Sequence, residues 1–380
     1  MNWQPKIWRF FNDIFAIDWL LLIAALLLSA AGLVTMYSFS DQGRFFGRQI
    51  IWLAISVGVF FFFSLIDWRF LRRSGVVVFI FIFSVILLLS LFFFSQAIKG
   101  SERWLNFGIF AFQPSDPAKL ALIILLSKYF SRRHVEIAHL KHIILSGLYA
   151  FVFFLLIFLQ PNLSSAIIIF FIWFGMVMVS GISKKHVFGV LGLAVVSFLL
   201  LWGFALEDYQ KQRIATFVDP LADTRGAGYN ALQSVIAVGS GQWLGKGVGF
   251  GTQSRLRFLP EYQTDFIFAA FAEEWGFIGA LILLLLFGTV IWRIVKTTLY
   301  GASNFEVLFG AGLAIWLISH FTIHVGMNVG LLPVTGIALP FMSYGGSHLI
   351  TEFALLGIIM GMRKYNRSIL GEEKEEKTLI

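Results

Sequence analysis

Residues 258–276 read FLPEYQTDFIFAAFAEEWG, and they take the chain from a polar loop into an apolar helix. The apolar run is typical of a membrane-spanning segment, yet it contains Asp265, Glu273 and Glu274. A carboxylate near the hydrocarbon core of a bilayer is costly, so each of these groups needs a partner, a water-filled cavity or a chemical role. The stretch therefore indicates a membrane protein with structurally or functionally important carboxylates near one edge of the bilayer.

The composition of the whole chain is that of a polytopic membrane protein. Of its 380 residues, 58% are hydrophobic and 13% are charged, with a mean hydropathy of +0.82. A soluble domain is about 45–50% apolar and about 25% charged. The formal net charge of +8 resides in short clusters between apolar runs, which favours a role in membrane topology over nucleic-acid binding. The chain has no cysteine, which excludes disulfides and thiolate chemistry.

The apolar runs predict an all-α protein with about ten transmembrane helices, since crossing a bilayer takes about 20 residues. The opening segment, residues 1–17, has the features of a cytosolic helix on the membrane interface and not those of a cleavable signal peptide. The predicted spans are 18–38, 48–66, 75–95, 115–131, 142–160, 163–182, 186–206, 265–292, 304–327 and 346–363.

Basic residues in the connections predict the orientation of these spans. Connections rich in Lys and Arg alternate with poorer ones, and the rich ones face the cytosol. Both termini are then cytosolic, and residues 207–264 form a large extracytoplasmic loop between the seventh and eighth spans. The expected organisation is a single transmembrane domain over 1–380, with the interfacial segment at 1–17 and a cytosolic tail at 364–380.

Most polar motifs then lie at or near the outer face, whereas a channel or a coupled carrier would place them along or midway through the spans. In the outer loop KGSERWLNFG (99–108), Arg103 can hold a phosphate through its guanidinium or can anchor the loop at the interface. At the start of the fourth span, Lys119 lies three residues from Asp116, which favours a structural ion pair.

The long loop is a second polar region, because it is rich in glycine and in basic residues. A cationic surface beside the bilayer suits a large anionic lipid headgroup. The alternative is a plain linker, but structureless connections of this length are uncommon. The basic residues are Lys211, Arg213, Arg225, Lys246, Arg255 and Arg257.

Asp265 has two interpretations. Thr264 can cap the eighth span, and the helix dipole favours a carboxylate in the first turn. Alternatively, Asp265 is a general base at the interface; an aspartate is a weak base at its ordinary pKa, and partial desolvation would strengthen it. Glu273 and Glu274 lie about 12–14 Å deeper along the helix. We expect one of them to face the bundle and bond to a polar group of another helix, in a structural or cation-holding role.

Residues 328–348, NVGLLPVTGIALPFMSYGGSH, cannot form a continuous span because of their prolines and glycine pairs. They predict a re-entrant or extended segment that is buried against protein and can roof a cavity. His320 and His324, one helical turn apart, can suit zinc. Because neither a carboxylate motif nor a cysteine accompanies them, we interpret both histidines as structural.

Three motifs that follow one another along the chain resemble the SEDS family (shape, elongation, division and sporulation). They are GAGYNALQS, GKGVGFGTQSRLRFLPEYQTDFIFAAFAEE and NVGLLPVTGIALPFMSYGGS, and the resemblance covers nearly the whole chain. It implies a peptidoglycan glycosyltransferase that polymerises lipid II at the outer face of the bacterial cytoplasmic membrane, together with a class B penicillin-binding protein. KGSERWL and GTQS are more similar to the elongation member than to the division member, which implies a role in cell shape.

The resemblance also implies site residues. The aspartate of TDFIF, which is proposed to be catalytic in the family, falls on Asp265. The expected chemistry is an inverting transfer in which cations stabilise a departing diphosphate, with a divalent cation, Mg²⁺ or Mn²⁺, as an additional bridge. The expected environment is membrane lipid without nucleic acid. The residues expected to bind substrate are Arg103, Lys119, Lys246, Arg255, Arg257, Glu261 and Ser343.

This chain departs from the family pattern at particular positions. Asn162 stands where an aspartate is usual, so a cation or proton role of that carboxylate would be lost or moved. Gln263 replaces a usual histidine, and Asp116 a common glutamate. Two rival functions remain open at this point, a lipid II flippase without bond chemistry and a scaffold that only recruits partners. A flippase should carry polar groups through to the cytosolic face, and a scaffold does not explain charges inside the spans.

Overall fold

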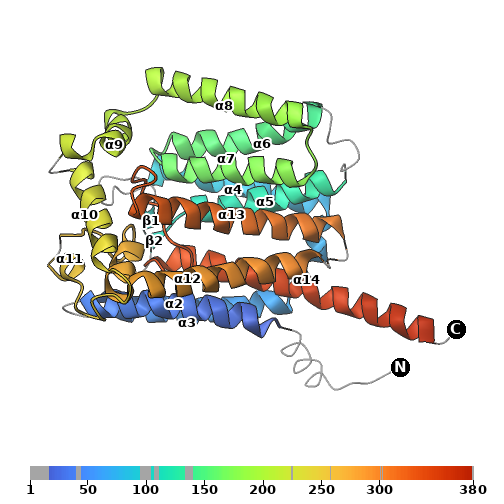
Figure 1. Cartoon of the computed structure of the whole chain (residues 1–380). Helices are drawn as coiled ribbons and strands as arrows, with labels where there is room; N and C mark the ends of the chain where they lie inside the picture. The colour runs from blue at the N-terminus through green and yellow to red at the C-terminus, as the bar shows by residue number, and fades with distance from the viewer. Residues whose placement is uncertain are drawn as a thin grey trace.

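Apolar helices that run side by side form nearly the whole protein in the computed structural model (Figure 1). The structure describes residues 17–39, 44–94, 104–106, 111–132, 140–223, 226–256, 258–299, 301 and 303–378. Each predicted span falls on a helix. These helices are α2 (Trp19–Phe39), α3 (Arg44–Leu65), α4 (Ser74–Phe94), α5 (Ser115–Ser131), α6 (Leu140–Phe158), α7 (Leu163–Val179), α8 (Lys184–Phe204), α12 (Ile267–Leu299), α13 (Asn304–Asn328) and α14 (Gly346–Thr378).

Shorter elements connect the long helices. The region predicted as a large loop is mostly helical, which excludes the plain linker. Figure 1 shows its helices α9–α11 gathered at one end of the bundle, opposite the end at which α14 terminates. The short elements are η1 (Trp68–Arg72), the antiparallel pair β1 (Leu105–Asn106) and β2 (Ala111–Phe112), α9 (Asp208–Val218), η2 (Pro220–Ala222), α10 (Ala227–Ser240) and α11 (Thr252–Arg255).

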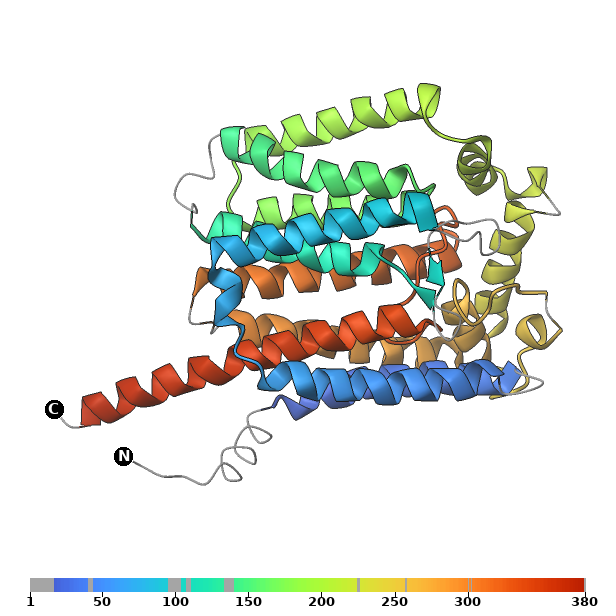
Figure 2. The ribbon, with the colours of Figure 1, turned by 180° about the vertical axis from the view of Figure 1, so that it is seen from behind.

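The surface and packing of the helices are those of a protein that lies in lipid. Within the described residues, seven helices are long and apolar enough to cross a membrane, which are α2, α3, α4, α6, α8, α12 and α13. Phe79 and Phe93 of α4 are 67% and 81% exposed, as expected for side chains that face hydrocarbon. Segments far apart in sequence pack together, with α14 against α3 and α12 against α2 and α13 (Figure 2).

Helix α12 is broken at Gly276, whose φ and ψ are 65° and −165°. The loop at 242–247 supplies the hydrogen bonds that the break removes. Lys246 and Gly247 donate their backbone N–H groups to the carbonyls of Glu273 and Glu274, at 3.0 Å each. The N–H groups of the two residues after the break in turn donate to the carbonyls of the loop residues Gln242 and Trp243, at 2.8 and 3.1 Å. A backbone break inside an apolar helix is tolerated because the protein satisfies its polar groups.

Candidate active site

Asp265 lies immediately before α12, on a turn that Glu261 organises. Glu261 has a φ of 49°, and its carbonyl accepts the N–H groups of Thr264 and Asp265 at 3.0 and 3.1 Å. The Thr264 hydroxyl donates to the same carbonyl, at 3.3 Å. The prediction that Thr264 caps the helix with Asp265 in its first turn is therefore wrong, because α12 begins at Ile267.

The backbone of Asp265 is fixed by the last residue of α13. Asn328 is fully buried, and its Nδ2 donates to the Asp265 carbonyl at 3.1 Å. Its Oδ1 accepts the N–H of Ala269, in the first turn of α12, at 3.2 Å. One amide side chain thus joins the end of α13 to both sides of the start of α12, while the Asp265 residue remains half-buried.

Residues 331–345, called the strap below, lie against Asp265. They contain no helix or strand, and several of their side chains, such as Leu339, are buried, which confirms the predicted extended segment. Gly336 has a φ of +73°, and a Cβ at this position would lie 3.2 Å from Oδ2 of Asp265. The carboxylate therefore packs on a position where a side chain would interfere with it.

Two other residues predicted to form the site, Ser343 of the strap and Glu261 of the Asp265 turn, have different roles. Ser343 is 4% exposed, and its Oγ accepts the N–H of Leu339 and donates to the carbonyl of Thr264, at 2.8 Å each. The hydroxyl thus has a structural use, and its predicted substrate contact stays a prediction. Glu261 shapes the Asp265 turn, and its Oε2 accepts a hydrogen bond from Nε2 of Gln263 at 3.2 Å. Gln263, which replaces the histidine usual in the family, thus stabilises the turn through this hydrogen bond.

The two glutamates of α12 hold the loop that inserts into the break, and Glu274 also has a side-chain hydrogen bond with Ser38 of the membrane-spanning helix α2, which confirms the expected polar partner on another helix. Glu273 Oε1 accepts from Lys246 Nζ at 2.8 Å and from the N–H of Gln253 at 3.0 Å. Glu274 Oε1 accepts the N–H of Gly249 at 2.5 Å. The ammonium of Lys246 is therefore committed to Glu273, two helical turns from Asp265 along α12. Both buried carboxylates have partners because the loop folds back onto the helix.

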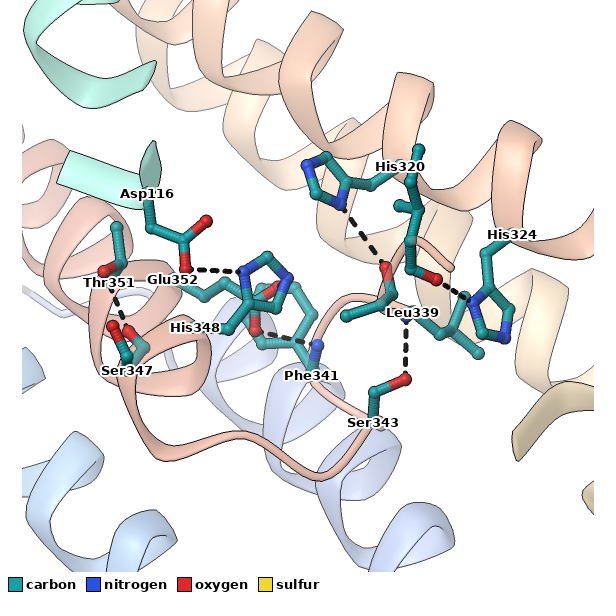
Figure 3. Close-up of polar contacts among 12 residues, drawn as sticks. Asp116, His320, His324, Leu339, Phe341, Ser343, Ser347, His348, Thr351 and Glu352 are labelled. Atoms are coloured by element: carbon teal, nitrogen blue, oxygen red, sulfur yellow. Dashed lines mark hydrogen bonds and ion pairs between the residues drawn. The ribbon is translucent and has the colours of Figure 1, made fainter. Parts of the chain in front are cut away.

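Lys119 belongs to a buried charge network with Asp116, and Figure 3 shows the continuation of this network from Asp116 to His348. Lys119 is 2% exposed, and its Nζ donates to Oδ1 of Asp116 at 3.0 Å, which confirms the predicted ion pair and leaves it little access to substrate. The other Asp116 oxygen lies 3.4 Å from Nδ1 of His348, whose Nε2 lies 2.9 Å from Oε1 of Glu352. Sequence reasoning missed His348 and Glu352, although polar residues inside the last apolar span were the signal.

The remaining cations were predicted from the long loop and the outer loop. Arg255 is exposed at the end of α11. Arg103, Arg225 and Arg257 lie outside the described residues. Arg213, on α9, donates through Nη1 to the carbonyl of Thr335 in the strap at 3.3 Å. Among the cations that the structure describes, Arg213 is thus hydrogen-bonded to the strap.

The histidines of α13 hold the strap by its backbone. Nδ1 of His320 lies 3.3 Å from the carbonyl oxygen of Ala338, and Nδ1 of His324 lies 2.6 Å from that of Ile337 (Figure 3). The structural interpretation of both residues is confirmed. Within the described part of the chain, no group of three or more His, Cys, Asp or Glu residues could hold a metal ion.

Asn162, which stands where the family usually has an aspartate, caps the N-terminus of α7. Its Oδ1 accepts the N–H of Ser165 at 3.2 Å. An asparagine satisfies a helix N-terminus as well as an aspartate does. The structure therefore gives Asn162 a role that needs no charge.

An apolar helical bundle with a half-buried carboxylate under a backbone strap at one end defines a polytopic membrane protein whose site lies at the edge of the bundle. The model of the cell cycle protein family of FtsW, RodA and SpoVE matches residues 12–368, and the chain belongs to this family. It is 36% identical over 351 residues to the Escherichia coli (strain K12) protein named peptidoglycan glycosyltransferase MrdB, covering 92% of this chain and 94% of that protein.

Solved structures share the fold. A chain from a peptidoglycan synthase complex, described as coordinating polymerization and crosslinking, matches with a TM-score of 0.80 and 28% identity, over 92% of this chain and 98% of that one. The crystal structure of the Thermus thermophilus rod shape determining protein RodA matches with a TM-score of 0.69 and 27% identity, over 92% of this chain and 97% of that one.

Proposed function

We propose that this chain is a peptidoglycan glycosyltransferase that polymerises lipid II into glycan strands during cell elongation and cell-shape maintenance. Its relatives carry this activity in their names. The observation that carries the proposal is the placement of Asp265, a half-buried carboxylate with a fixed backbone at the end of an apolar bundle. A polyprenyl tail can stay in lipid there while the sugars meet the loops.

The proposed membrane topology has ten crossings in the bacterial cytoplasmic membrane, with both termini cytosolic and residues 207–264 outside. A helix on each predicted span supports the count. The position of α9–α11 at the end of the bundle opposite the end of α14 supports the orientation (Figure 1). The same proposal places 1–17 on the cytosolic interface and 364–380 in a cytosolic tail, where α14 continues to Thr378.

The proposed reaction is an inverting glycosyl transfer. The 4-hydroxyl of the acceptor GlcNAc attacks the anomeric carbon of the lipid-linked donor, and Asp265 accepts the hydroxyl proton as the new C–O bond forms. The bond from the anomeric carbon to the diphosphate breaks, and the diphosphate leaves with the electron pair. Cations placed in advance stabilise the charge that develops on this leaving group. Arg103, Arg255 and Arg257 are the proposed cations. Lys246 is a further proposed cation, and it would contribute its charge while it remains paired with Glu273.

In this proposal, a divalent cation would enter the site bound to the substrate. The described residues do not group into a resident metal site. Magnesium or manganese would then take its ligands chiefly from the diphosphate oxygens and water, which are the hard donors that Mg²⁺ prefers. We assign no step of the reaction to it.

A class B penicillin-binding protein is the proposed partner. The synthase complex that shares this fold is described as coordinating polymerization with crosslinking. Crosslinking the product is the transpeptidase chemistry that such a partner supplies. The partner therefore belongs in any test of activity.

The test is polymerisation of labelled lipid II by the purified chain in detergent, with and without the partner. We expect a ladder of glycan polymers from the wild-type chain and none from Asp265→Asn. Asp219→Asn is the matched control, because Asp219 is exposed in the same region and its side chain accepts the N–H of Leu221, its own neighbour in a short turn. Movement of lipid II across vesicles without polymer would instead support the flippase, and a wild-type level of polymer from Asp265→Asn would refute the role of this carboxylate.

A further inference from the structure

The strap reaches Asp265 through a strained turn at 339–344. Phe341, at its centre, has a φ of 63° and is 1% exposed. Residues with L side chains rarely adopt positive φ, and a bulky one persists there only when its surroundings hold it. Phe341 packs edge-to-face on Phe353 of α14, with ring centroids 5.7 Å apart. The ring contact fixes the side chain, and the backbone needs a separate restraint.

A buried carboxylate supplies that restraint. Glu352 of α14 is 1% exposed, and its Oε2 accepts the N–H of Phe341 at 2.9 Å (Figure 3). Its Oε1 lies 2.9 Å from Nε2 of His348, one turn earlier on the same helix. His348 in turn lies 3.4 Å from Asp116 of α5. The carboxylate that holds the turn is thus itself held between two helices.

The far side of the turn holds the residues just before Asp265. Ser343 donates its hydroxyl to the Thr264 carbonyl, and Tyr344 donates its N–H to the Gln263 carbonyl, each at 2.8 Å. Gln49 of α3 also holds this turn, because its Nε2 donates to the Ser343 carbonyl at 3.1 Å. A hydrogen-bonded path therefore runs from Glu352 through the turn to the backbone that presents the Asp265 carboxylate.

We infer that Glu352 is a positioning residue for Asp265, acting through the Phe341 turn and Ser343. The inference rests on the proposed function, because it assigns Glu352 to the geometry of the reaction that Asp265 carries out. Glu352 does not touch substrate in this account. It keeps the turn in its strained conformation, and the turn keeps Asp265 against Gly336.

The restraint depends on an acceptor oxygen more than on a charge. The amide that Glu352→Gln introduces can accept the Phe341 N–H through its oxygen. Glu352→Ala removes the acceptor and leaves the N–H of Phe341 buried without a partner. A general base must lie within hydrogen-bond reach of its proton, so a displaced Asp265 loses rate while the loops that bind substrate remain.

The experiment measures kcat and KM for lipid II polymerisation with the full chain and its partner, for Glu352→Ala, Glu352→Gln and Ser343→Ala. A misplacement of about 1 Å costs about 100-fold in rate. We expect a loss of this order in kcat for Glu352→Ala, a smaller loss for Ser343→Ala, and KM within about threefold for both, because the lost contact is not with substrate. Glu352→Gln should retain most of the wild-type kcat.

Thr351→Val is the matched control, because the Thr351 hydroxyl donates to the Ser347 carbonyl of its own helix, at 2.9 Å, and not to the turn. It should leave kcat unchanged. The inference is overturned if Glu352→Ala, at equal amounts of folded protein, keeps the wild-type kcat, or if Glu352→Gln loses as much as Glu352→Ala. If the wild-type chain itself makes no polymer while Asp265→Asn behaves like it, the proposed function has failed, which is a different result.

Discussion

The two ends of the bundle satisfy their buried carboxylates in different ways. At the end that carries Asp265, the carboxylates of Glu273, Glu274 and Glu352 accept hydrogen bonds from backbone N–H groups of connecting segments, and Glu273 also pairs with the ammonium of Lys246. At the opposite end the partners are guanidinium groups of other helical segments. Asp18 pairs with Arg293 at 2.5 Å and with Arg363 at 3.2 Å, and Glu306 pairs with Arg72.

We infer from this difference that the Asp265 end is the one at which changes bear on the proposed reaction. A guanidinium pair joins two regular elements and can be exchanged for well-packed apolar residues with little change in shape. A carboxylate that accepts a backbone N–H instead dictates the path of a non-helical segment. We therefore expect changes at the Asp265 end to alter activity at constant fold, and changes at the Asp18 end to alter stability at constant activity.

The largest effect should come from Asp265→Asn. The amide cannot accept the hydroxyl proton, and loss of a general base costs about 10²–10⁴-fold in rate. Because this residue is half-buried and Asn328 holds its backbone carbonyl, we expect an unchanged melting temperature. Initial rates of lipid II polymerisation and thermal unfolding of the same preparation check both parts. A melting temperature that falls together with the rate would assign Asp265 to structure instead.

Asp18→Asn should have the converse outcome. It removes the negative charge from a side chain that is 3% exposed and with which two arginines form ion pairs. Breaking a buried ion pair from one side costs about 3–5 kcal/mol, and the partly exposed arginines reduce this cost toward the lower value. We expect a lower melting temperature and an unchanged kcat per folded molecule. A large fall in kcat at a normal melting temperature would contradict the division between the two ends.

Gly276→Ala should affect the Asp265 end through the break in α12. A Cβ at Gly276 would lie 2.3 Å from the backbone nitrogen of Gly245, and the backbone conformation there, with φ 65° and ψ −165°, costs a residue with a side chain about 1–3 kcal/mol. The loop at 242–247 must then move out of the break. We expect a lower melting temperature and faster proteolysis after Lys246, whose ammonium pairs with Glu273. Gly288→Ala is the control, since a Cβ at Gly288 meets nothing within 4 Å.

The helices could be predicted from sequence because each apolar run carries its own signal of length and hydropathy. The strap was predictable for the converse reason, since its prolines and glycine pairs cannot continue a helix. The pair of Lys119 with Asp116 was also predictable, because the two residues are three apart on one helix. All of these features depend on neighbours in sequence.

The features that escaped prediction depend on distant partners. Glu274 accepts the N–H of Gly249, 25 residues away, and no periodicity links the two positions. The Thr264 cap was wrong because the turn at Glu261, with its positive φ, and the strap together determine how α12 begins. Ser343 was expected to contact substrate, yet its hydroxyl is used by two backbone groups. Residue type and the family resemblance identified Asp265 as the proposed catalytic carboxylate, and only the fold showed which groups hold it in place.

The smallest effect should come from Asn162→Asp, which restores the residue usual in the family. Asn162 Oδ1 already accepts the Ser165 N–H at the start of α7, and an aspartate can do the same with a charge that the helix dipole favours by about 0.3–1 kcal/mol. We expect a slightly higher melting temperature and a polymerisation rate within about twofold of wild type, a change too small to indicate a lost function of the carboxylate. Rates measured with and without Mg²⁺ extend the test. A severalfold rise in kcat that appears only with the metal would show that a carboxylate at this position binds a cation. Position 162 would then take part in the reaction proposed for the Asp265 end of the bundle.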